Sequence, residues 1–133
     1  MLTEFQLALR REFGRAVRYR QPLALLLVDL HPGPDALGRV RDAIRVCDSA
    51  APAPGDRTAV ILPETALAGA LLVATRLAGA LGPPLGSGGP PAVGVAAYPS
   101  PQIADADALL AAAQKAVENA RSNGGGILTP LVR

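Results

Sequence analysis

Few side chains in this sequence can do chemistry, and their spacing limits the sites they can form. His31 is the only histidine and Cys47 the only cysteine, so the chain has neither a histidine–cysteine metal site nor an internal disulfide. Asp29 follows a strongly apolar run, and Arg45 lies three residues before Asp48, a spacing that suits an ion pair on a helix. We predict that His31 is a turn residue and that Cys47 is a core residue on the apolar face of a helix.

The composition indicates one compact domain and argues against several classes of protein. A chain of 133 residues, half of them apolar, can bury a core without disulfides or metals, and we expect residues 1–133 to form a single domain. A formal net charge of +2 and an aromatic content of 3% argue against nucleic-acid binding. The apolar run 23–30 is too short to cross a membrane, and the charged N-terminus is unlike a signal peptide. Together with the lone cysteine, these features predict a cytoplasmic protein.

Hydrophobic periodicity predicts helices that alternate with strands around one sheet. Residues 23–30 are expected to form a buried central strand, covered on both faces. Residues 49–55, with two prolines, are expected to be a loop or a damaged hairpin, and residues 82–91 a flexible surface loop. The predicted helices are 1–20, 35–47, 65–81 and 104–122, and the other predicted strands are 58–62, 92–98 and 127–128. This order predicts an α/β or α+β fold with helices packed on one sheet.

Each predicted helix has an apolar stripe that is expected to face the sheet. In the first helix the stripe is Phe5, Leu9, Phe13, Ala16 and Val17, in the second Leu37, Val40, Ile44 and Cys47, and in the third Leu67, Leu71, Ala74 and Leu77. Thr3, Asp35 and Thr65 are expected to cap the starts of these three helices.

Six segments, taken in order along the chain, carry a family resemblance. They are residues 21–29 (QPLALLLVD), 45–48 (RVCD), 54–58 (PGDRT), 59–65 (AVILPET), 93–99 (VGVAAYP) and 113–121 (AQKAVENAR). They resemble the catalytic strand, the RxxD motif, the signature hairpin, the two later strands and the final helix of the GGDEF (diguanylate cyclase) family. The resemblance implies that family's sandwich, a mainly antiparallel sheet flanked by helices, shortened here after the first strand.

The resemblance also implies a degenerate active site. In the family, carboxylates hold Mg²⁺ against the triphosphate of GTP, and Asp29, Gly55, Asp56 and Arg57 stand at positions of that site. Arg57 replaces the metal-binding glutamate, and because its guanidinium opposes a metal ion, we expect it to pair with Asp29 instead. Further departures from the family pattern are His31, Pro54, Thr58, Gln114 and Arg121. We therefore expect no metal, no cofactor and no catalysis.

A second site of the family is retained in part. Arg45 and Asp48 keep the spacing of the inhibitory site that binds cyclic di-GMP, and Arg76 aligns with the second arginine of that site. Arginine can donate forked hydrogen bonds to guanine or phosphate, and a carboxylate can accept hydrogen bonds from guanine. The same residues also fit a plain surface ion pair and a solvated helix arginine.

Two functions stay open for such an inactive signalling domain, and an active cyclase is a third, less favoured one. The domain is either a regulatory module that binds cyclic di-GMP through Arg45, Asp48 and Arg76, or a nucleotide-independent scaffold. A scaffold would bind a protein partner in a bacterial signalling pathway, or a second copy of itself. The expected contact surfaces are the loop 82–91 and the first helix, with its five arginines Arg10, Arg11, Arg15, Arg18 and Arg20.

Overall fold

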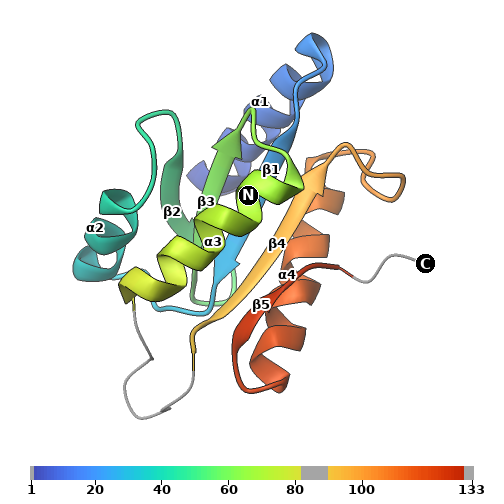
Figure 1. The fold of residues 1–133 in the computed structure, drawn as a ribbon. Helices are drawn as coiled ribbons and strands as arrows, with labels where there is room; N and C mark the ends of the chain where they lie inside the picture. Colours follow the sequence, from blue (N-terminus) through green and yellow to red (C-terminus); the bar gives the residue numbers. More distant parts are fainter. Residues whose placement is uncertain (1, 82–89, 131–133) are drawn as a thin grey trace.

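The structure of this protein is a computed structural model, and it describes residues 2–81 and 90–130. Most of the predicted loop 82–91 therefore lies outside the described residues. The elements follow in the order α1, β1, α2, β2, β3, α3, β4, α4, β5, and the strands form one five-stranded sheet (Figure 1). No helix in the described part of the chain is long and apolar enough to cross a membrane.

The centre of the sheet is β1 (Leu23–Val28), as its continuous apolar run predicted. It pairs antiparallel with β3 (Arg57–Pro63) on one side and with β4 (Ala92–Tyr98) on the other. The edge strands are β2 (Ser49–Ala53), antiparallel to β3, and β5 (Gly126–Leu128), parallel to β4. In the strand order β2-β3-β1-β4-β5 three of the four pairings are antiparallel, which confirms the expected mainly antiparallel sheet.

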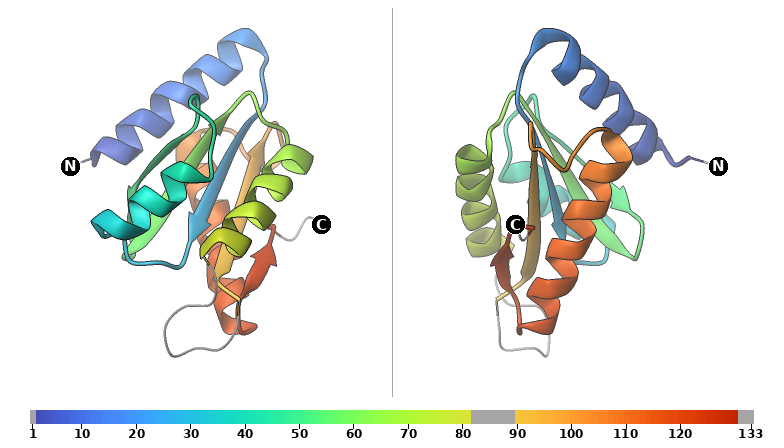
Figure 2. Two further views of the ribbon diagram at one scale, coloured as in Figure 1. Left: turned by 60° about the vertical axis from the view of Figure 1, so that its left-hand side comes forward. Right: turned by 90° about the vertical axis from the view of Figure 1, so that its right-hand side faces the viewer.

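Helices cover both faces of this sheet (Figure 2). The side chains of β1 alternate between the two layers. Leu25 and Leu27 pack with α1 (Glu4–Tyr19) and α4 (Ala106–Ser122) on one face. Leu26 and Val28 pack on the other face, with α2 (Pro34–Asp42) and α3 (Leu67–Leu81). All six residues of β1 are buried, so this strand connects two separate apolar cores.

Helix starts follow the expected capping chemistry in part. Thr3 caps α1 in a capping box with Gln6, as predicted. The N-cap of α2 is Gly33 and not Asp35, because Pro34 already occupies the first turn of the helix. Helix α3 begins only at Leu67, and the Thr65 hydroxyl bonds outside the helix, donating to the Pro63 carbonyl at 2.8 Å.

Several predicted burials are wrong for local reasons. Helix α2 ends at Asp42, so Cys47 lies in the turn before β2 and is exposed instead of buried in the core. Val17 and Leu67 are 50% and 41% exposed, because each lies at the edge of its helix's apolar stripe. Residues 49–53 form a regular strand, and an edge position tolerates Pro52 because its outer side needs no N–H donor.

Candidate functional site

The turn between β2 and β3 carries the residues predicted as a remnant active site. Gly55 and Asp56 both adopt positive φ, 82° and 59°, which lets the chain reverse within three residues. The next residue, Arg57, starts β3 beside the end of β1. A Cβ on Gly55 would lie 3.4 Å from Nη1 of Arg57, so the turn packs directly over the guanidinium.

Arg57 and Asp29 form the ion pair that the sequence predicted. Nε of Arg57 lies 3.7 Å from Oδ1 of Asp29, and Nε of Arg121, from α4, lies 3.7 Å from Oδ2. Nη1 of Arg57 also lies 3.8 Å from Oε1 of Glu118, one turn earlier on α4. The Arg57 side chain is only 9% exposed, so this network of two arginines and two acids fills the space beside the end of β1.

The arrangement does not suit a divalent metal ion. Asp29 already faces two guanidiniums, and no group of three histidine, cysteine or acidic side chains within the described ranges is placed to hold a metal. Asp56 is not part of the Asp29 network, because its Oδ1 lies 2.6 Å from Nδ1 of His31 in an exposed contact. The structure therefore brings Asp29, Gly55 and Arg57 together and leaves Asp56 apart. Sequence analysis missed the contact between His31 and Asp56.

Arg45 and Asp48 form a tight pair at the start of β2. The backbone N and Nε of Arg45 donate to Oδ2 of Asp48 at 3.0 and 3.1 Å, and Nη2 donates to Oδ1 at 3.0 Å. Nη2 also donates to Thr65 Oγ1 at 2.6 Å, which ties this turn to the start of α3. The hydrogen bond to Asp48 is the main reason that the pKa of Arg45 is raised. The Asp48 side chain is fully buried, whereas that of Arg45 stays 49% exposed.

Arg76 lies close to the same turn and has a local structural partner. Its Nε donates to the carbonyl of Ala43, at the C-cap of α2, at 3.0 Å. In return Arg39 of α2 donates from Nη2 to the carbonyls of Ala80 and Leu81, at the end of α3, at 3.0 and 2.7 Å. Each helix thus supplies a cation to the negative end of the other helix.

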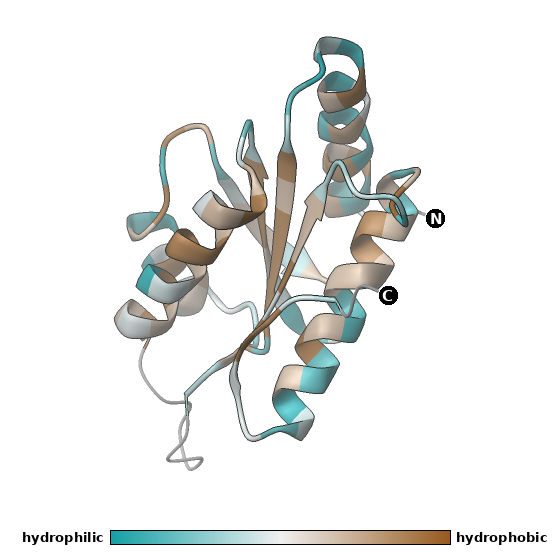
Figure 3. Cartoon of the chain, turned by 45° about the vertical axis from the view of Figure 1, so that its right-hand side comes forward, coloured by the Kyte–Doolittle hydropathy of each residue, from teal (hydrophilic) through white to brown (hydrophobic). Residues whose placement is uncertain are grey.

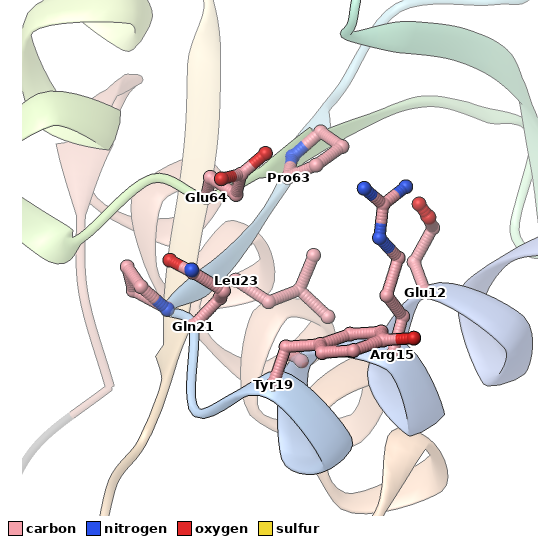
Figure 4. Close-up of a pocket in the computed structure, with 9 residues that line it drawn as sticks. Glu12, Arg15, Tyr19, Gln21, Leu23, Pro63 and Glu64 are labelled. Atoms are coloured by element: carbon pink, nitrogen blue, oxygen red, sulfur yellow. The ribbon is translucent and has the colours of Figure 1, made fainter.

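A surface cavity of 440 Å³, which sequence analysis did not identify, lies where α1 leads into β1 (Figure 4). Arg15, Glu12 and Tyr19 of α1 form one wall, and Glu64 and Pro63 the opposite wall. No sequence pattern indicates this cavity, because residues far apart in the chain form its two sides. Its charged residues are of both signs, so the cavity does not select one kind of ion.

On α1 itself, Arg10 is paired with Asp107 of α4 at 3.2 Å.

Several solved structures with this fold are GGDEF domains. The GGDEF domain of YfiN, or TpbB, from Pseudomonas aeruginosa matches with a TM-score of 0.82 and 24% identity, over 97% of this chain and 94% of that one. A sensory box/GGDEF family protein from Caulobacter crescentus matches with a TM-score of 0.69 and 26% identity, over 89% and 90% of the two chains.

A further match has a bound nucleotide. The GGDEF domain of DgcB from Caulobacter crescentus, in complex with c-di-GMP, has a TM-score of 0.73 and 15% identity, over 93% and 84% of the two chains. No protein-family model matches the sequence, and no curated protein gives a significant match. The structural matches confirm the fold that the six sequence segments predicted.

Proposed function

The chain is a GGDEF-like domain, and from that premise we propose that it is a catalytically inactive signalling module that acts by binding another protein. The observation that carries the proposal is the network around Asp29. Two arginines stand within 4 Å of this carboxylate, at the place where the family's chemistry requires a metal ion. A guanidinium at that distance opposes the binding of a divalent cation.

The direct test of inactivity is an assay with GTP and Mg²⁺. We expect no cyclic di-GMP to form, even at high protein concentration and long incubation. Asp29→Ala is the matched control, because any product that persists in this variant comes from a contaminating enzyme. Product that forms with the native chain and disappears with Asp29→Ala would overturn the proposal.

Replacing Arg57 with glutamate is expected to make the stability of the domain depend on a divalent cation. The change places a third carboxylate beside Asp29 and Glu118, and removing the buried cation lowers the free energy of unfolding by about 2 kcal/mol or more. A divalent cation screens such a cluster of oxygen ligands and restores part of the loss.

The measurement is thermal unfolding with EDTA and with millimolar Mg²⁺ or Mn²⁺. We expect Arg57→Glu to unfold at a higher temperature with the metal than with EDTA. The native chain and Arg57→Gln should not respond, since neither supplies the additional carboxylate. If the metal stabilised the native chain as much as Arg57→Glu, Arg57 would not be the group that excludes the metal ion.

Cyclic di-GMP binding is the second candidate function. It is favoured by Arg45, in the connection between α2 and β2, and by Arg76 of α3, whose Nε reaches the Ala43 carbonyl at the same connection. It is also favoured by the fold shared with a domain solved in complex with c-di-GMP. The carboxylate of Asp48 argues against it. Both of its oxygens accept hydrogen bonds from Arg45 and its side chain is fully buried, so it offers no acceptor to guanine.

We therefore expect calorimetric titration of the native chain with cyclic di-GMP to give no binding heat. Any contact with Arg45 or Arg76 alone would be a weak, salt-sensitive phosphate contact. Micromolar binding that Arg45→Ala abolishes would instead establish the receptor function and require Asp48 to become exposed. Arg18→Ala, which removes an exposed arginine from α1, is the matched control.

A further inference from the structure

The solvent side of α3 is almost free of charge. Only one of the exposed residues of this helix is charged, Arg76, and it is the only charged residue among Leu67–Leu81. The other exposed residues are Leu67, Ala68, Leu72, Thr75, Gly79 and Ala80. Figure 3 shows α3 mostly in pale and brown colours, in contrast to the teal bands on α4. A surface helix normally carries charged and polar side chains on its solvent side. This side of α3 therefore resembles a surface that another element covers.

Besides Leu67, which is 41% exposed at the start of α3, two apolar side chains on or beside this helix extend into solvent. Leu72 is 72% exposed, and Val46, in the turn that Arg76 and Arg45 connect to α3, is fully exposed. Ala68, Leu72 and Thr75 are spaced four and three residues apart and so lie on one stripe of the helix. We call Val46, Ala68, Leu72, Thr75 and Arg76 together the α3 surface.

The charge of the α3 surface selects the kind of partner. Arg76 has no carboxylate partner among the residues that the structure describes, and its only hydrogen bond there is to the carbonyl of Ala43. The nearby Asp48 is buried and already paired with Arg45. A partner that covers Leu72 therefore satisfies Arg76 best by placing a carboxylate beside it.

A second copy of this chain does not meet that requirement. In a two-fold symmetric pair of α3 helices, each Arg76 would face the α3 helix of the other copy. That helix carries no acidic residue, so it offers no carboxylate to Arg76. The complementary partner is therefore a different protein.

We propose that the α3 surface is the docking site of an apolar helix from another protein, with a glutamate or aspartate placed against Arg76. This inference rests on the proposed function and names the surface through which it acts. The partner helix packs along the stripe of Ala68, Leu72 and Thr75, and its carboxylate sets the register on α3. The few apolar residues on the surface make this a small, transient interface.

The test uses the full chain and two synthetic helical peptides. Both peptides carry the same leucine and alanine stripe, and they differ only in a glutamate or a lysine at the position that faces Arg76. We expect the native chain to bind the glutamate peptide at least tenfold more tightly than the lysine peptide, and Arg76→Glu to reverse this preference. Leu72→Asp should weaken both complexes at least tenfold, while Arg18→Glu, an equal charge change on α1, should leave both unchanged.

Residue-by-residue NMR shifts identify the surface that binds. Shifts that cluster on residues 43–48 and 66–76 support the proposal, and the reversal by Arg76→Glu separates recognition from any loss of stability. No binding at millimolar peptide, or binding that Leu72→Asp leaves unchanged, overturns it. So does self-association that Leu72→Asp abolishes, because the occupant would then be a second copy. Shifts confined to α1 refute the α3 surface alone and leave the proposed protein-binding function standing. Whether the domain lacks cyclase activity is decided separately, by the GTP assay.

Discussion

Replacing Gly94 with alanine is expected to destabilise the domain by about 3 kcal/mol or more, the largest effect of any methyl-sized change in the sheet. A Cβ at this position would lie 2.6 Å from the Ala113 carbonyl oxygen and 2.9 Å from Cα of Val117, and closer still to the Val117 nitrogen. All three atoms belong to the backbone of α4, so no side-chain rotation relieves the clash and the helix itself has to move away from β4.

The same clash would disturb the network around Asp29. Glu118 and Arg121 follow Val117 on α4 and reach across to Arg57 and Asp29. A displaced α4 therefore separates the ion pairs that fill the space beside the end of β1. Thermal unfolding followed by circular dichroism should show a melting temperature about 10 °C lower for Gly94→Ala.

The matched control is Gly14→Ala in α1. A Cβ on Gly14 meets no atom within 4 Å, and the residue is helical and exposed, so alanine should stabilise the domain by about 0.5–1 kcal/mol. A melting temperature for Gly94→Ala within a degree of the native value would contradict the close packing of β4 against α4.

The core of the fold was predictable because its apolar patterns are long enough and regular enough to favour one kind of element in each segment. A continuous apolar run as short as β1, bounded by prolines, favours a strand with a layer on each face, and β1 occupies that position. The stripe of α4 was equally clear, since Leu109, Ala113, Val117 and Ala120 recur at helical spacing and are all buried. Such patterns depend only on which residues must leave water.

The ends of elements were harder to predict, because they depend on tertiary pairing. The spacing of Val40, Ile44 and Cys47 continues a helical stripe, yet α2 stops at Asp42 and the chain turns into β2. The strand itself forms despite Pro52 because β3 supplies a paired edge. Neither the early stop nor the pairing is visible in local propensity, so Cys47 was wrongly placed in the core.

The candidate sites, like the fold, were predictable only in part. Opposite charges at Asp29 and Arg57 predicted their pairing once both were placed at neighbouring strand ends, and the structure confirms it. The direction in which the Asp56 side chain points was not predictable, because it depends on the positive φ of this turn residue and on the position of His31. The spacing of Arg45 and Asp48 likewise could not distinguish a ligand-binding pair from an internal ion pair. The distinction depends on whether the Asp48 carboxylate is exposed or buried.

Replacing Asp48 with asparagine is expected to lower the free energy of unfolding by about 2–3 kcal/mol. The carboxylate accepts three hydrogen bonds from Arg45 and is fully buried. An amide of the same shape retains one acceptor oxygen and turns an N–H₂ group toward an arginine donor, which leaves two donors facing each other. Thermal unfolding should show a melting temperature about 8 °C lower than that of the native chain.

Asp42→Asn is the control for this prediction, because Asp42 is exposed at the end of α2 and the same change of charge there should shift the melting temperature by no more than a degree or two. The comparison also decides between the two roles of the RxxD segment. A carboxylate kept for a ligand contributes little to folding, so an equal, small effect of Asp48→Asn and Asp42→Asn would mean that Asp48 is free to bind cyclic di-GMP. A large loss for Asp48→Asn alone means that this carboxylate holds the α2–β2 turn against α3. The Arg45–Asp48 pair then supports the surface that we assign to a protein partner.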